Sequence, residues 1–187
     1  MSLVKRNAQV GAEIAIAIAQ QQRETTAKST STTKTTTTIQ DTKTTTFQDS
    51  KFVVMGGIVQ DIVAKPSAEL RLHTSNPAVS VPSDGGVGRN VAEALGRLGS
   101  HPILYSAVGT AAGGGPNDVL HRLQKDCGVQ CAAGESIAMV PHVNTASYIA
   151  ILNQDGDLHT ACADMTALQE IVIPPTSVLQ KAEFLVA

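Results

Sequence analysis

Aromatic residues and net charge are both scarce in this chain, and each scarcity excludes a class of function. Of 187 residues only 3% are aromatic and none is tryptophan, so the chain lacks the stacking surfaces that bind single-stranded nucleic acid. A formal charge of −2 provides no attraction to nucleic acid or to an anionic membrane. No apolar run is long enough to span a bilayer. With 42% hydrophobic residues, the composition predicts one globular domain that acts on a small molecule.

Cysteine is also scarce, and its pattern excludes a disulfide framework. The chain has an odd number of cysteines, namely Cys127, Cys131 and Cys162. Nothing resembling a secretory signal precedes them. Both observations indicate a reducing, cytoplasmic compartment. A mitochondrial transit peptide is the alternative, because the first forty residues are basic, rich in Ser and Thr and nearly free of acids. No second His or Cys pair complements Cys127 and Cys131, so we predict free thiols and no metal site.

The first fifty residues divide into two segments of different composition. Residues 2–20 place alanines, Ile14 and Ile18 at helical spacing, which predicts a helix within residues 1–20. Residues 25–46 are mostly threonine with a few lysines, and such a segment buries too little apolar surface to offset the entropy of ordering. We therefore expect a disordered linker over 21–50 and a folded domain over 51–187.

The most informative stretch is DGGVGRNVAEALGRLG, residues 84–99, where a glycine-rich turn runs directly into an amphipathic helix. Gly85, Gly86 and Gly88 permit positive φ and close approach of a ligand to the backbone, and Asn90 can point its amide at that ligand. The apolar positions that recur at the spacing of one helix face are Val91, Ala94, Leu95 and Leu98. These positions predict the buried side of the helix.

Two other interpretations of this turn were weighed. A dinucleotide-binding fingerprint requires a third glycine three residues after Gly88, where this chain has Val91, so that interpretation fails on spacing. A plain turn whose glycines contact no ligand stays open. Gly99 is a natural C-terminal stop for the helix.

Predicted strands and helices alternate around this stretch. An apolar run from Phe52 that ends at Gly56-Gly57, and a second run over residues 101–109, predict buried strands. Residues 116–129 predict a helix that ends at Gly128. Its inward-facing residues are Val119, Leu120 and Leu123. This alternation implies a parallel sheet with right-handed crossovers and helices on both faces.

The remaining segments predict smaller elements. Residues 69–83 mix short apolar and polar groups, as in a strand open to solvent on one face. Residues 144–163 contain two apolar runs around Asp155-Gly156, which is a strong hairpin signal. Residues 174–187 predict a short helix and then a strand from Phe184.

The run GGVGRNVAEALGRLG, followed by a strand and Gly109, resembles the first signature of the ribokinase-like (PfkB) carbohydrate kinases, and among these it resembles the pseudouridine kinases. The resemblance covers residues 52–187, roughly the first half of such a domain. It implies an α/β fold, a parallel-sheet sandwich with a small β lid, truncated in this chain. It also implies ATP and Mg as cofactors, a nucleoside or sugar as the small-molecule partner, and a homodimer formed through the lid.

The resemblance further implies roles for individual residues. The family aspartate that matches Asp61 binds sugar hydroxyls, and Gly85, Gly86 and Asn90 match the rest of the substrate-binding signature. A solvent-facing aspartate on an edge strand is the alternative for Asp61. The family's base and anion-binding turn come from a G-A-G-D motif, which this sequence does not contain. We therefore assign no catalytic residue and expect the isolated chain to be inactive as a kinase.

Within residues 2–20, the run LVKRNAQVGAEIA resembles the terminal helix of pseudouridine-5′-phosphate glycosidases. Because the glycosidase and the kinase act in sequence, the two resemblances together predict part of a bifunctional enzyme of pseudouridine degradation. A noncatalytic protein that binds a nucleoside, or that associates with a full-length kinase, is the alternative.

Overall fold

A computed structural model describes residues 47–111 and 117–187, which belong to one compact unit. The helix predicted within residues 1–20, and the predicted linker as far as residue 46, lie outside the described residues. The end of that linker is attached to the fold, because Phe47 packs against the core and Ser50 is buried. Ordered contacts thus begin a few residues before the predicted boundary at residue 51.

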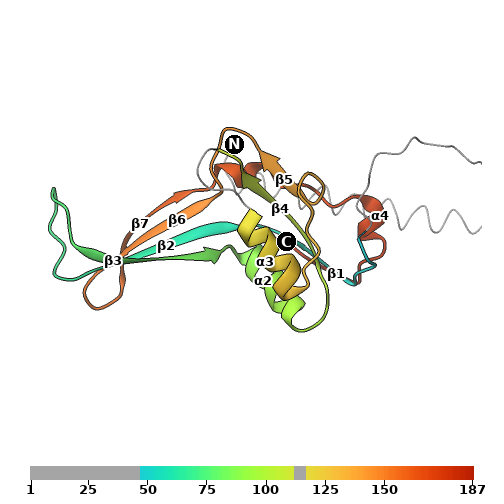
Figure 1. Cartoon of the computed structure of the whole chain (residues 1–187), viewed down its shortest axis with the longest axis horizontal. Helices are drawn as coiled ribbons and strands as arrows, with labels where there is room; N and C mark the ends of the chain where they lie inside the picture. The colour runs from blue at the N-terminus through green and yellow to red at the C-terminus, as the bar shows by residue number, and fades with distance from the viewer. Residues whose placement is uncertain (1–46, 112–116) are drawn as a thin grey trace, which may run out of the picture. The chain divides into compact units, whose positions relative to one another are not determined.

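The central sheet of the described residues has four parallel strands in the order β5-β4-β1-β8 (Figure 1). They are β1 (Phe52–Met55), β4 (Ile103–Gly109), β5 (Ile137–Val140) and β8 (Phe184–Val186), and all three pairings are parallel. Every residue of β4 is buried, as expected of a strand covered on both faces. The predicted parallel sheet is confirmed.

Helices cover both faces of this sheet. On one face lie α2 (Val87–Arg97) and α3 (Asn117–Cys127), side by side in Figure 1. The core that they share with the sheet includes Val54, Leu104, Val108, Leu123 and Ile137. On the other face, Val178 of the short α4 (Thr176–Leu179) packs toward a cluster around Val53 and Tyr105. The inward residues predicted for α3 are buried, which confirms that prediction.

The buried face of α2 differs from the predicted one. Its buried residues are Gly88, Ala92 and Gly96, spaced four apart. Leu98 is 81% exposed and Ala94 is also exposed, so the prediction that both face the core is wrong. The reason is backbone proximity, because a Cβ at Gly96 would lie 2.2 Å from a carbonyl oxygen at the end of α3. Small residues therefore define the packed face, and the larger Val91 and Leu95 pack at its margin.

Helix α2 ends in a Schellman turn. The N–H of Gly99 donates to the carbonyl of Gly96 at 2.8 Å, and the N–H of Ser100 donates to that of Leu95 at 3.0 Å. Gly99 has a φ of 79°, which a residue with a side chain adopts at a cost. The prediction that the helix ends at Gly99 is therefore confirmed.

A second sheet, in the order β3-β2-β6-β7, forms the predicted small β lid. Its strands are β2 (Val59–Pro66), β3 (Ala78–Gly85), β6 (Ser147–Leu152) and β7 (Leu158–Asp164). β2 pairs with β3 antiparallel and with β6 parallel, while β6 and β7 form the hairpin predicted around Asp155-Gly156. At the base of the sheet, Val59 and Ala146 pack against Leu168 of the 3₁₀ helix η1 (Thr166–Glu170).

Candidate functional site

The two sheets join where two glycine pairs meet. β1 runs into β2 through Gly56 and Gly57, and β3 runs into α2 through Gly86, whose φ is 95°. A Cβ on Gly86 would lie 2.3 Å from the Gly57 carbonyl oxygen, and a Cβ on Gly88 would lie 2.6 Å from the Gly56 Cα. The N–H of Arg89 donates to the same Gly57 carbonyl at 3.1 Å. Backbone contact of this kind requires glycine, so these residues set where the small sheet meets α2.

Asp61 lies on β2 beside this junction and is partly exposed. It pairs in register with Ser83 of β3, and its carboxylate covers the Cα of Gly85. A Cβ at Gly85 would lie 2.0 Å from Oδ2 of Asp61. Within residues 47–111 and 117–187, the carboxylate has no hydrogen bond or ion pair of its own. Both oxygens are therefore open to a ligand's hydroxyl donors.

Asn90 is exposed in the first turn of α2, and its amide contacts Arg89. Nη1 of Arg89 donates to Oδ1 of Asn90 at 2.8 Å and to the carbonyl of Asp84 at 3.2 Å. Nη2 of Arg89 forms an ion pair with Glu93, which also binds Arg97 at 2.8 Å. The Arg89 side chain is only 15% exposed. Three charged residues at four-residue spacing thus link the first turn of α2 to its last turn.

Sequence reasoning did not find Arg89. Its signal in the sequence is the spacing of Arg89, Glu93 and Arg97, which places alternating charges on one side of a helix. That pattern is common on solvent-exposed helix faces, so it does not by itself indicate a functional residue. The contact with Asn90 appears only in the structure.

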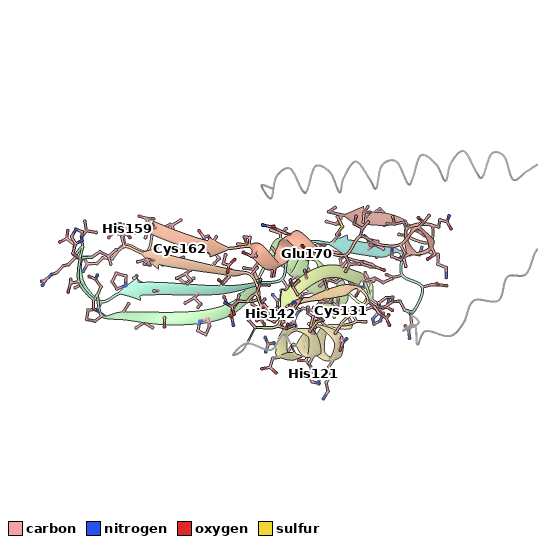
Figure 2. All side chains as sticks on the ribbon, turned by 90° about the horizontal axis from the view of Figure 1, so that it is seen from above. His121, Cys131, His142, His159, Cys162 and Glu170 are labelled. Atoms are coloured by element: carbon pink, nitrogen blue, oxygen red, sulfur yellow. The ribbon has the colours of Figure 1, made fainter. Side chains whose placement is uncertain are left out.

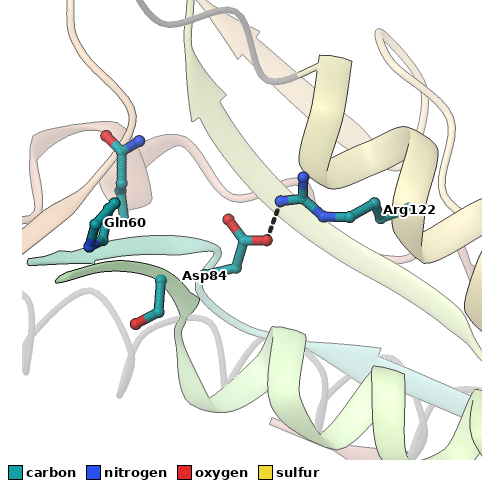
Figure 3. A pocket seen from close by; sticks show the side chains of 5 residues that line it. Gln60, Asp84 and Arg122 are labelled. Atoms are coloured by element: carbon teal, nitrogen blue, oxygen red, sulfur yellow. Dashed lines mark hydrogen bonds and ion pairs between the residues drawn. The ribbon is translucent and has the colours of Figure 1, made fainter.

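A pocket of about 250 Å³ lies between the β2–β3 strand pair and α3 (Figure 3). Its lining residues are Gln60, Pro82, Ser83, Asp84 and Arg122. Arg122 of α3 donates to the carboxylate of Asp84, and this bond raises the pKa of Arg122. Side chains alternate along a strand, so Gln60 and Asp84 point away from the face that carries Asp61. The pocket therefore includes none of the predicted substrate-binding residues.

The predicted site residues are thus brought together only in part. Asp61 lies against Gly85, Gly86 lies against the backbone of the β1–β2 turn, and Asn90 is held by Arg89. No hydrogen bond joins the side chains of Asp61 and Asn90 in the described part of the chain.

Histidines and cysteines do not converge on a site. Figure 2 shows His159 and Cys162 on the small sheet and Cys131 beside the central sheet. Among the residues that the structure describes, no three His, Cys, Asp or Glu side chains are placed to hold a metal ion. All three cysteines are free, and burial raises the pKa of the Cys131 thiol to about 12. No described helix has the length and apolar character needed to cross a bilayer.

Comparison with known sequences identifies relatives of this chain. No family model matches it. The pseudouridine kinase of Escherichia coli strain K12 is 33% identical over 113 residues, covering 60% of this chain and 34% of the relative. The pseudouridine kinase of Arabidopsis thaliana is 26% identical over 122 residues, covering 65% of this chain and 30% of the relative. The chain therefore spans about a third of the length of the curated relatives that it matches.

Solved structures agree with this resemblance. A sugar kinase from Clostridium perfringens superposes with a TM-score of 0.59 at 25% identity, over 75% of this chain and 44% of that protein. A ribokinase from Arabidopsis thaliana, solved with ribose and ATP, has a TM-score of 0.54 at 20% identity, over 64% of this chain and 37% of that protein. The described residues therefore have the α/β fold of the ribokinase-like (PfkB) carbohydrate kinases. In sequence, the chain is similar to the pseudouridine kinases of that class.

Proposed function

We propose that residues 47–187 provide the sugar-binding part of a pseudouridine kinase, in which Asp61 accepts hydrogen bonds from the hydroxyls of the ribosyl group. The observation that carries this proposal is the Asp61 carboxylate, which is seated over Gly85 and has no partner among the described residues. A carboxylate accepts hydroxyl hydrogens on both oxygens, and each charge-assisted bond contributes about 1.5–3 kcal/mol. The similarity to two pseudouridine kinases supports a ribosyl nucleoside as the ligand.

The other predicted residues have distinct parts in this proposal. Gly85 leaves room for the Asp61 carboxylate, which any Cβ at that position would displace. Gly86 turns the backbone from β3 into α2, and Asn90 offers its amide from the first turn of that helix. The ligand is thus a small polar molecule held by one carboxylate, one amide and a glycine-lined backbone.

The proposed reaction is ATP-dependent phosphorylation of pseudouridine to its 5′-phosphate. The Arabidopsis ribokinase, which binds ATP, supports ATP as the donor for the fold class. The sequence does not contain the G-A-G-D motif, from which by the resemblance the base and the anion-binding turn of the family come, so the described residues are not assigned to ATP or Mg²⁺. No transfer step is assigned to them, and we propose that this chain alone does not phosphorylate the nucleoside.

Two further elements belong to the same proposal, and a second candidate function stands beside it. The resemblance of residues 2–20 to a glycosidase helix supports a bifunctional kinase and glycosidase. The small sheet is the proposed surface for a homodimer. A noncatalytic nucleoside-binding protein is the second candidate, and the lack of the G-A-G-D motif favours it.

Titration of the full chain with pseudouridine, followed by calorimetry or ligand-observed NMR, tests the binding role. Asp61→Asn removes the charge with almost no change in shape, and we expect affinity to fall about tenfold or more. Asp84→Asn is the matched control, because it makes the same change on the opposite face of the ribbon. Equal affinity of the wild type and Asp61→Asn would remove Asp61 from the site.

A further inference from the structure

We propose that Arg89 is a positioning residue that turns the Asn90 carboxamide so that its NH₂ group is the one presented to the ligand. This inference rests on the proposed function, and it assigns to Asn90 the part of a hydrogen-bond donor. The combination of Asp61 as acceptor and Asn90 as donor then favours a ligand with neighbouring hydroxyls over the corresponding deoxy compound.

The orientation of the amide follows from the chemistry of arginine. A guanidinium group carries only donors, so the atom of Asn90 that meets Nη1 of Arg89 at 2.8 Å must be the oxygen. The NH₂ group then points elsewhere, and it has no partner in the described part of the chain. Asn90 is exposed, so both N–H donors are accessible to a ligand.

Arg89 is itself held in place at two other points. Its Nη1 donates to the Asp84 carbonyl at the end of β3, and its Nη2 pairs with Glu93 one turn further along α2. Side chains of adjacent helix residues normally diverge, so the bond to Asn90 depends on these anchors. Arg89 is 15% exposed and Glu93 is 17% exposed, which limits screening of the ion pair by water and salt. Arg97 holds Glu93 from the opposite side at 2.8 Å.

The consequence for recognition concerns donors and acceptors. The ionised Asp61 carboxylate only accepts hydrogen bonds, and the free NH₂ of Asn90 only donates them. A hydroxyl does both, so one hydroxyl can give its hydrogen to Asp61 and a neighbour can receive one from Asn90. A ligand that lacks one of two neighbouring hydroxyls leaves a polar group unpaired, and sites of this kind reject such analogues strongly.

Binding of pseudouridine by four variants of the full chain tests the inference. Asn90→Asp retains the oxygen that Arg89 holds but replaces the NH₂ by a second oxygen, and we expect affinity to fall about tenfold. Arg89→Met removes the donors while keeping an extended side chain, and we expect a loss of about threefold to tenfold. Arg89→Lys restores one donor and should recover part of that loss. Arg97→Met is the matched control, because Arg97 binds Glu93 but does not touch Asn90.

The NMR signals of the Asn90 NH₂ protons report on positioning directly. We expect them to shift in Arg89→Met without ligand, and to shift in the wild type when pseudouridine is added. Wild-type affinity in Asn90→Asp, or unchanged Asn90 signals in Arg89→Met, would overturn this inference and leave the proposed function standing. A folded wild-type chain that fails to bind pseudouridine would overturn both. If Arg89→Met does not fold, Arg89→Lys takes its place in the NMR comparison, and unchanged Asn90 signals in that variant would overturn the positioning role.

Discussion

The central sheet and the small sheet differ strongly in how far the structure buries their strands. Every residue of β4 is buried, whereas β3 is exposed from Ala78 to Ser83, with Val79 at 67% and Val81 at 58% exposure. The difference arises because α2, α3 and α4 pack on the central sheet. The covering helices therefore account for the burial of the central sheet, and the candidate site lies at the boundary where the covered sheet meets the uncovered one.

Thiol reactivity should show the largest difference between the two regions. Cys131 lies in the core beside the central sheet, and Cys162 is exposed on β7 of the small sheet. Burial raises the pKa of Cys131 to about 12, so at pH 8 its thiolate fraction is about a thousandfold below that of an ordinary thiol. We expect a chromogenic disulfide reagent to modify one thiol per chain rapidly, and Cys162→Ser to abolish that fast phase. Fast modification of two or more thiols would show that the core is open.

The same shift predicts a pH dependence of stability. The pKa of Cys131 is higher in the folded chain than the value of 9.0 for a free thiol. Its contribution to stability is therefore complete below about pH 9 and is lost as the pH rises toward 12. Urea unfolding at pH 8 and pH 10 should give a lower free energy of unfolding at pH 10, and Cys131→Ala should reduce that difference.

Truncating one apolar side chain in each sheet should lower the free energy of unfolding much more in the central sheet than in the small sheet. Leu104 of β4 is 0% exposed, so Leu104→Ala removes buried surface and leaves a cavity that costs about 2–5 kcal/mol. Val81→Ala on the exposed β3 should cost less than about 0.5 kcal/mol. Chemical denaturation of both variants measures the difference. Similar losses in the two would mean that the small sheet is covered in solution.

We expect a single added methyl group at the junction between the sheets to lower the free energy of unfolding. Gly86→Ala requires a Cβ at 2.3 Å from the Gly57 carbonyl oxygen and a side chain at a φ of 95°, so we expect a loss of about 2–4 kcal/mol. Gly99→Ala is the matched control, because Gly99 also has a positive φ but its Cβ would meet nothing within 4 Å. The difference in free energy of unfolding between the two variants isolates the backbone contact. Equal losses would argue against that contact.

The smallest effect is expected from the ion pair that joins the small sheet to α3. Arg122 and Asp84 have side chains 50% and 26% exposed, and pairs of this kind contribute about 0–1 kcal/mol. A double-mutant cycle with Asp84→Asn and Arg122→Met should therefore give a coupling energy below about 1 kcal/mol that decreases at high salt. A larger, salt-insensitive coupling would show that the pocket between them is more enclosed than the structure indicates.

Much of the fold was predictable because its signals are local. The apolar run at β4, the inward face of α3 and the Asp155-Gly156 hairpin each depend on periodicity or turn chemistry within a short stretch, and the structure has all three. The buried face of α2 was not predictable in this way. Its packing uses Gly88, Ala92 and Gly96, which a search for large apolar residues overlooks.

For the candidate site, the sequence by itself determined the residue types: an aspartate in an apolar strand, paired glycines before a helix, and an asparagine in its first turn. Only the tertiary structure decided that Asp61 lies over Gly85, that Gly86 meets Gly57, and that Arg89 holds Asn90. The physical reason is that the first two contacts join segments that are distant in the chain, where periodicity carries no information. The third depends on anchors that Arg89 finds at the end of β3 and on the next turn of α2, and these exist only once the strand and the helix have met.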